Sequence, residues 1–186
     1  MKRSLVFIAI TVLGLQANAS RAVEAVLDLR GAGVGGNGCV GGAALIDLSP
    51  NDILQIRTPE LVNDSARSPQ IERKACAVSI PFQLPRNMKL VVSAGRVQTT
   101  LSLKAGAVAR TNAELFTAGT RGPTINSVDN GPKKQVSLLK IAGLETGCGA
   151  SGILRLNLNQ ALIAKAARSR SSIDGAKLSL RLAACR

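Results

Sequence analysis

The segment 71–85 alternates between apolar and polar positions, and this pattern indicates the fold class. Its even positions from Cys76 to Leu84 are all apolar, whereas its odd positions include Arg73 and Gln83. Alternation with a period of two is typical of a strand that buries one face. The segment therefore predicts a strand that ends at a proline turn and points Cys76 into the core.

Alternating or short apolar segments recur along the chain between Gly, Pro, Asn and Asp residues, and each predicts a further strand. The expected strands cover residues 21–30, 43–48, 53–57, 88–93, 97–103, 136–141, 153–158 and 177–181. By periodicity, residues 107–116 could form a strand or a helix, and the surrounding β pattern favours a strand. A short helical turn is expected over 161–167, and loops are expected over 58–70, 122–134 and 168–172. No long amphipathic helix accompanies them. We therefore predict an all-β fold, an antiparallel β-sandwich of about eight to nine short strands.

Residues 1–19 have the three parts of a secretory signal peptide. Lys2 and Arg3 charge its start, an apolar run follows, and residues 17–19 form a small-x-small cleavage site. The apolar run is shorter than the roughly 20 residues that a membrane-spanning helix needs. We therefore expect residues 20–186 to form a single soluble domain without a transmembrane anchor, secreted to the periplasm or the cell exterior.

Basic residues outnumber acidic ones two to one in this expected mature chain. Loss of Lys2 and Arg3 lowers the basic count from 24 to 22 against 11 acidic residues, and lowers the net charge from +13 to +11. Such an excess favours contact with polyanions such as envelope phosphates, acidic polysaccharide or extracellular nucleic acid. A solvated cationic surface that only keeps the protein soluble is an equally open alternative.

The predicted loops and the short helical turn before the last of them contain the basic residues that we expect to contact an anion. They are Lys133, Lys134, Lys165, Arg168 and Arg170. Proteins that bind single-stranded nucleic acid place aromatic residues among their basic residues, but this chain has 3 Phe and no Tyr or Trp. Any nucleic-acid contact would therefore involve backbone phosphates and would weaken with salt.

Four cysteines in an exported chain predict two disulfide bonds, with three possible pairings. We favour Cys39 with Cys76 and Cys148 with Cys185, because each pair is separated by 37 positions and would staple one half of the chain. Each bond would stabilise the fold by roughly 3 to 4 kcal/mol in the chain-entropy account. A zinc site is the alternative, but the chain has no Cys-x-x-Cys pair and no histidine.

The glycine-rich segment 31–36 matches the GxGxxG pattern of dinucleotide-binding proteins. That pattern needs a helix after the glycines and an acidic residue about 20 positions further on. Here a predicted strand follows, and Asp47 comes too early. We therefore expect no cofactor.

Few residues offer catalytic chemistry. Without histidine, triads that use imidazole are excluded, and oxidised cysteines cannot act as nucleophiles. The carboxylate pairs Asp47 with Asp52 and Asp129 with Asp174 remain candidates, although acidic residues in turns are usually turn formers. We name no catalytic or metal-binding residue, and favour a binding or structural module for anionic extracellular or envelope material. The alternative is a secreted enzyme inhibitor or a carboxylate-dependent hydrolase.

Several segments carry a further pattern of cysteines and flanking residues. They are Glu72–Cys76 before the alternating segment and its Pro85 turn, Gly38-Cys39, Cys148-Gly149, and Ser172-Ile173-Asp174-Gly175 followed by Cys185. Together they resemble a family of secreted four-cysteine proteins, catalogued as domain of unknown function 4360, over about Gly33 to Arg186. The resemblance implies a small exported β-sandwich and no established activity.

This chain departs from the family pattern at three positions. Relatives usually have aromatic residues beside Gly95 and ahead of the last cysteine. Here those positions hold Ala94, Arg96 and Leu182. If the aromatic residues form a binding face in relatives, that face is altered in this chain.

Overall fold

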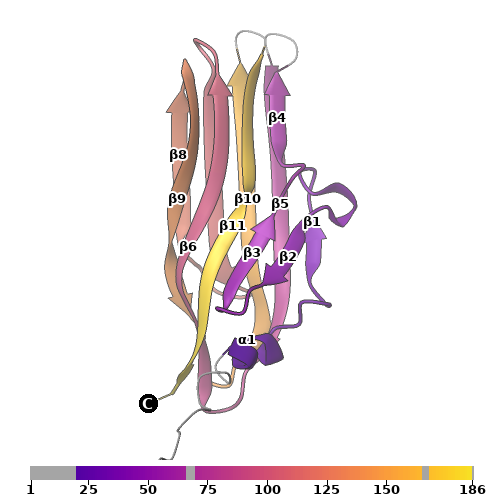
Figure 1. The fold of residues 1–186 in the computed structure, drawn as a ribbon, viewed down its shortest axis with the longest axis vertical. Coiled ribbons are helices and arrows are strands. Elements are labelled where there is room, and N and C mark those ends of the chain that lie inside the picture. The colour runs from indigo at the N-terminus through magenta and orange to yellow at the C-terminus, as the bar shows by residue number, and fades with distance from the viewer. Residues whose placement is uncertain (1–19, 66–69, 165–167, 186) are drawn as a thin grey trace, which may run out of the picture.

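A computed structural model describes residues 20–65, 70–164 and 168–185 of the 186-residue chain. The predicted signal peptide and Lys165 lie outside these ranges. The described residues form two antiparallel sheets whose long strands run side by side (Figure 1). The prediction of an antiparallel β-sandwich is confirmed.

One short α-helix, one 3-10 turn and eleven strands make up the described part of the chain. In chain order they are α1 (Ser20–Val26), β1 (Gly33–Gly35), η1 (Val40–Gly42), β2 (Leu45–Leu48), β3 (Ile53–Arg57), β4 (Val62–Ser65), β5 (Gln70–Gln83), β6 (Met88–Leu103), β7 (Val108–Thr117), β8 (Thr124–Asn130), β9 (Lys133–Glu145), β10 (Ser151–Ala164) and β11 (Ser169–Ala184). The structure thus has eleven strands where about eight to nine short ones were expected, and β6 and β11 each span 16 residues.

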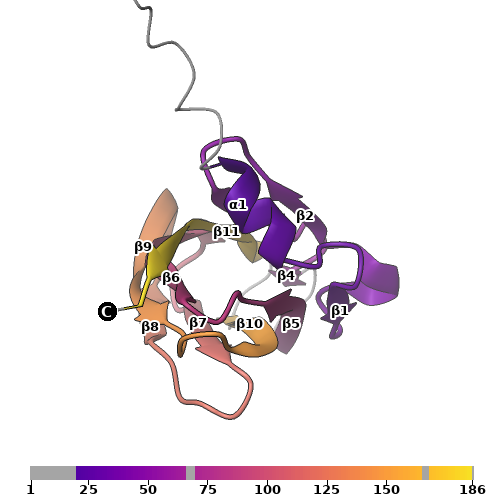
Figure 2. The ribbon, with the colours of Figure 1, turned by 90° about the horizontal axis from the view of Figure 1, so that it is seen from below.

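The strands divide into two sheets. Sheet A has the order β1-β5-β10-β7-β8, and sheet B has the order β2-β3-β11-β6-β9, with β4 also paired to β11. Seen from below, the two sheets form facing layers (Figure 2). The outer face of sheet B faces the viewer in Figure 1.

Aliphatic side chains from both sheets fill the space between the layers. The predicted inward positions of β5 are buried, and Cys76, Val78 and Ile80 are each 1% exposed. Leu158 on β10 lies directly opposite Cys76 and belongs to the same core. Because these side chains alternate with exposed ones, the period of two predicted for this strand is confirmed.

Two disulfides staple different parts of the sandwich. Cys39 is bonded to Cys76 inside the core, and Cys148 is bonded to Cys185 at the end of the strands. Cys185 follows the last residue of β11 and is half-buried, so its bond lies outside the hydrophobic core. No described cysteine is free.

A polar layer crosses the interior between two hydrophobic clusters. Gln160 lies between Leu158 and Leu162, which belong to different clusters, and Thr111 and Thr99 hold the equivalent places on β7 and β6. The Thr111 hydroxyl donates a hydrogen bond of 3.1 Å to Gln160 Oε1. Hydrogen bonding compensates part of the free energy lost when such groups leave water.

The predicted strand 21–30 is wrong, because its first part forms α1. Val23 and Leu27 are four positions apart and buried, whereas Ala25 between them is exposed. This is the spacing of one helix face. The helix covers the end of the core, where Leu27 forms an isolated bridge with Phe82 of β5.

Three predicted loops, the predicted helical turn and the expected interruption between strands 88–93 and 97–103 are also wrong. Segment 122–134 contains β8 and the start of β9, segment 58–70 contains β4, and β11 begins at Ser169. The expected helical turn at 161–167 is strand up to Ala164, and β6 continues through Gly95. The buried residues of β4 and of the start of β11 are polar, so no apolar alternation marked these segments.

Among the described residues, no helix has the length and apolar character of a membrane-spanning segment.

Candidate functional site

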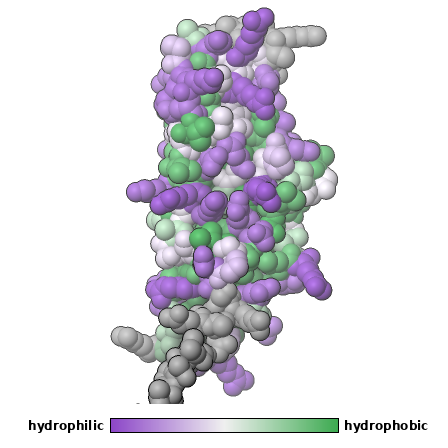
Figure 3. All heavy atoms as spheres, viewed as in Figure 1, coloured by the Kyte–Doolittle hydropathy of each residue, from purple (hydrophilic) through white to green (hydrophobic). Residues whose placement is uncertain are grey.

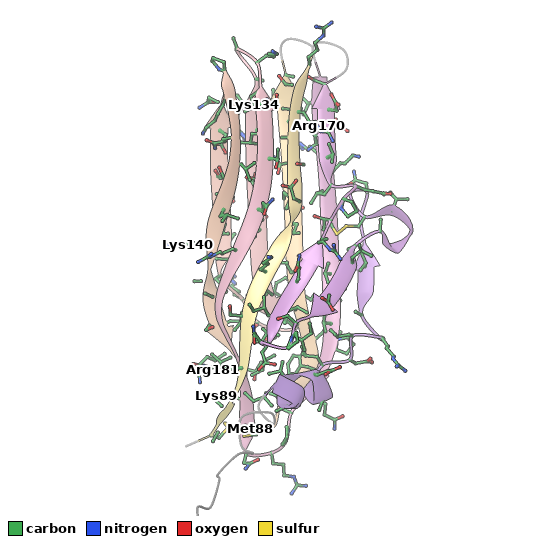
Figure 4. All side chains as sticks on the ribbon, viewed as in Figure 1. Met88, Lys89, Lys134, Lys140, Arg170 and Arg181 are labelled. Atoms are coloured by element: carbon green, nitrogen blue, oxygen red, sulfur yellow. A yellow bond between two sulfur atoms is a disulfide. The ribbon has the colours of Figure 1, made fainter. Side chains whose placement is uncertain are left out.

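Two of the predicted anion contacts lie together on the outer face of sheet B. Arg170 on β11 and Lys134 on β9 are both opposite Ser102 of β6, one on each side. Both side chains are exposed. They lie on paired strands near the upper end of the molecule (Figure 4), and not on the loops that we expected.

The other three predicted contacts do not join this pair. Lys133 is half-buried and forms an ion pair with Asp129. Arg168 is exposed and has a positive φ of 70° where the chain enters β11. Lys165 lies outside the described residues.

The same face carries a row of basic residues that the sequence did not suggest. Lys177 on β11 is directly opposite Arg96 on β6, which is directly opposite Lys140 on β9. All three side chains are exposed. Since neighbouring strands lie about 5 Å apart, the three basic residues follow one another across the sheet at that backbone spacing. We call Lys177, Arg96 and Lys140 the cationic row.

Further basic residues extend this face along the strands. Lys140 lies about midway along the molecule, and Arg181 and Lys89 lie towards its lower end (Figure 4). Figure 3 shows hydrophilic side chains over much of this face, with apolar residues between them. The basic residues of sheet B therefore run along its whole outer face.

A hollow of about 360 Å³ adjoins the cationic row. It forms where β11 has a register shift between Ile173 and Gly175. Gly175 has a φ of 153°, and a Cβ there would collide with the carbonyl oxygen of Ile56 in β3. A larger residue is therefore excluded at this position, where β11 approaches the backbone of β3 closely. Arg57, Arg96 and Lys177 line the hollow.

Asp174 is the one acidic residue that lines this hollow, and neutral groups bind it. Its carboxylate accepts hydrogen bonds from Thr100 Oγ1 at 2.7 Å, from Ser172 Oγ at 2.7 Å and from Gln98 Nε2 at 3.2 Å. It forms no ion pair with a described basic residue. The three basic side chains around the hollow therefore keep their charges free.

Only two ion pairs occur among the described residues, and one of them is on this face. Lys89 pairs with Glu145. The hydrogen bond and the charge of Lys89 hold the pKa of the Glu145 carboxyl below its usual range, with a smaller contribution from Arg181. No member of the cationic row takes part in either pair, so the row can bind an external anion.

The candidate carboxylate pairs are not assembled into a catalytic site. Asp129 is on β8 of sheet A and binds Lys133, whereas Asp174 is on β11 of sheet B. Asp52 lies in the turn before β3, and Asp47 is an exposed residue of β2 opposite Gln55. Each of these carboxylates has its own separate surroundings.

The profile of one protein family, Domain of unknown function (DUF4360), matches residues 26–183. The chain belongs to this family. The match confirms the resemblance found in the sequence. In this DUF4360 protein, Ala94 and Arg96 are exposed on the face that carries the cationic row. No curated protein matches the chain.

Several solved structures of carbohydrate-binding modules show a distant likeness to the DUF4360 protein. The structure of TmCBM61 in complex with β-1,4-galactotriose has 12% identity and a TM-score of 0.37, over 83% of this chain and 88% of that one. A family 16 module has 10% identity and a TM-score of 0.26, over 77% and 96%. A family 11 module from Clostridium thermocellum, in complex with a β-1,3-1,4-mixed-linked tetrasaccharide, has 10% identity and a TM-score of 0.22, over 80% and 83%.

Proposed function

We propose that this protein is an exported, non-enzymatic module that binds a polyanion along the outer face of sheet B. One observation carries the proposal: Lys177, Arg96 and Lys140 are consecutive cross-strand neighbours, all exposed and none in an ion pair with a described residue. Like charges directly opposite each other destabilise a sheet. A ligand with repeated negative charges would remove that repulsion.

The hollow beside the row supports binding of a phosphate, sulfate or carboxylate group. Arg57 and Arg96 can each offer a planar fork of N–H donors, and Lys177 adds a compact charge. Arg170 and Lys134 extend the positive surface further along the strands. A chain with several anionic groups could therefore contact both regions at once.

The composition of the face favours charge contacts over stacking. The two described phenylalanines, Phe82 and Phe116, belong to strands of sheet A. Without an aromatic side chain on the outer face of sheet B, bases have no ring to stack on. We therefore propose an anionic envelope or extracellular polymer recognised through its charges, with affinity that falls as salt rises.

Export is part of the same proposal. It is supported by the signal-like segment 1–19 and by two disulfides, which persist in oxidising compartments. An exported cationic face would meet the anionic groups of an envelope or matrix directly.

Retention on a phosphate-bearing resin tests the proposal. The variant Arg96→Gln/Lys140→Gln/Lys177→Gln should elute at clearly lower salt than the unmodified protein. A matched variant, Arg30→Gln/Arg86→Gln/Arg121→Gln, loses the same charge from exposed residues outside the strands and should elute close to the unmodified protein. Equal elution of the two variants would show that net charge alone governs retention, and would reject the site.

A further inference from the structure

The outer face of sheet A, on the opposite side of the sandwich, carries a row of asparagines. Asn159 on β10 is directly opposite Asn112 on β7, which is directly opposite Asn126 on β8. Asparagine is depleted in strands, because its side chain competes with the backbone for hydrogen bonds. Three in cross-strand register, in the middle of adjacent strands, are not explained by strand propensity. We call them the amide row.

The amide row is a directed chain of hydrogen bonds. Asn159 Nδ2 donates to Asn112 Oδ1 at 3.0 Å, and Asn112 Nδ2 donates to Asn126 Oδ1 at 2.9 Å. Asn126 Nδ2 and Asn159 Oδ1 have no partner among the described residues. The row therefore ends in a free donor at β8 and a free acceptor at β10, and aligned amides polarise one another. Hydroxyl groups, which both donate and accept, complement such ends.

Asn37, another asparagine near this row, has a purely structural role, unlike the amide row with its two unpaired ends. Asn37 accepts from the Ala75 backbone N–H at 2.7 Å and donates to the Arg73 carbonyl at 2.9 Å. It thereby pairs with β5 like a short piece of strand, and both ends of its amide are used. Within the described part of the chain, the side chains of the amide row contact the backbone only through a 3.3 Å bond from Asn112 Nδ2 to the Ile125 carbonyl.

Two arginines lie beside the amide row. Ala161 on β10 is flanked by Arg73 on β5 and Arg110 on β7. Ala161 is two residues along β10 from Asn159, and Arg110 is two residues along β7 from Asn112. Both arginines are exposed, and neither side chain has a partner among the described residues. Their Cα atoms are about 10 Å apart, two strand spacings, with only a methyl group between the side chains.

These residues surround a groove of about 490 Å³. Its lining includes the amide row, both arginines and Val128, a β8 residue that is 59% exposed. The groove thus offers guanidinium groups that can bind an anion, side-chain amides that can bind hydroxyl groups, and an apolar surface at Val128. Glu114 is on the same face, on the far side of the amide row from the arginines. An anionic group is therefore favoured at the arginine side alone.

We propose that this groove binds a saccharide unit that carries a carboxylate, a hexuronate within an acidic glycan. Its carboxylate lies between Arg73 and Arg110, where bidentate hydrogen bonds are available. Its hydroxyls accept from Asn126 Nδ2 and donate to Asn159 Oδ1, and a face of its ring contacts Val128. The site is independent of the cationic row, because it belongs to the other sheet.

Titration with trigalacturonate tests this site in the Arg96→Gln/Lys140→Gln/Lys177→Gln protein, where the cationic row is absent. We expect binding in 150 mM NaCl, with NMR shifts of the side-chain amides of the amide row. The neutral galactose trisaccharide of the same linkage should bind at least tenfold more weakly. Arg110→Gln should lower the affinity for trigalacturonate at least tenfold. Arg121→Gln, an equal charge change on a loop, should leave that affinity unchanged.

Three outcomes would overturn the inference: no binding of trigalacturonate, equal binding of the neutral trisaccharide, or binding that leaves the three amide signals and the Arg110→Gln affinity unchanged. The amide shifts are measured with the groove intact, so they remain decisive if Arg110→Gln is poorly folded. Failure of trigalacturonate to bind the groove would not contradict the proposed polyanion contact on sheet B. Failure of the polyanion contact would likewise not contradict the groove.

Discussion

Lys177 of β11 and Arg96 of β6 form a directly opposed cross-strand pair of like charge on the outer face of sheet B. Such a pair lowers the stability of a sheet. Arg96→Gln should therefore raise the free energy of unfolding by a few tenths to about 1 kcal/mol at low salt. The gain should shrink at high salt because salt screens exposed charges.

Denaturant titration at two salt concentrations measures this effect, and Arg121→Gln serves as the control. A loss of stability in Arg96→Gln at low salt would mean that Arg96 supports the fold. The proposal that these opposed charges lower the stability of the sheet and serve anion binding would then fail.

The two disulfides differ in their access to solvent. Cys39 and Cys76 are 2% and 1% exposed, whereas Cys148 is exposed and Cys185 is half-buried. Thiol–disulfide exchange depends on access of the attacking thiolate. Under a mild reductant, alkylation followed by mass spectrometry should label Cys148 and Cys185 first. Earlier labelling of the core pair would contradict the structure.

Two buried hydroxyl groups, one with a hydrogen-bond partner and one without, should respond in opposite ways to removal. Thr111→Val removes the donor to Gln160 Oε1 and should cost about 1–3 kcal/mol, because a buried acceptor loses its partner. Ser171 is buried, and its hydroxyl has no partner among the described residues, so Ser171→Ala should be neutral or slightly stabilising. Chemical denaturation of both variants measures the difference. A larger loss in Ser171→Ala would contradict this account.

Asp52 makes the stability depend on pH. Burial raises the pKa of its carboxyl, so the charged form opposes folding, and this effect is complete above the folded-state pKa and absent below the unfolded one. Asp52→Asn removes the charge and suits the φ of 56°. It should stabilise the protein at pH 7 by less than about 1 kcal/mol, and the gain should vanish near pH 3.

Thermal unfolding across this pH range tests the prediction for Asp52. Asp47→Asn, on the exposed side of β2, should change the free energy of unfolding by no more than about 0.5 kcal/mol. If Asp52→Asn still raised the free energy of unfolding at pH 3, the stabilisation would not come from removal of the charge, and the prediction would be wrong.

The apolar strands could be predicted from the sequence, but the polar ones could not. β5 alternates clearly because its inward side chains from Cys76 to Phe82 are all apolar. β8 is an edge strand with the sequence TINSVDN, in which pairing with β7 outweighs the poor strand propensity of Asn and Asp. β11 begins with serines that are buried beside β4, so composition alone predicted a loop.

The site depends on strand register, which a single sequence does not give. Arg96, Lys140 and Lys177 come from three strands far apart in the chain and become neighbours only through pairing. A shift of one residue in any of these strands would turn a basic side chain inward. The sequence therefore predicted a cationic protein and two basic residues elsewhere on the same face, Lys134 and Arg170, but not the row itself.

The most direct test of the proposed function is the salt dependence of binding to linear polyphosphate, a probe without sugars or bases. The logarithm of the binding constant should fall linearly with the logarithm of the salt concentration. Arg96→Gln/Lys140→Gln/Lys177→Gln should reduce the steepness of that line by roughly two to three. Arg30→Gln/Arg86→Gln/Arg121→Gln should leave it almost unchanged. The same slope for both variants would contradict a binding site on the outer face of sheet B.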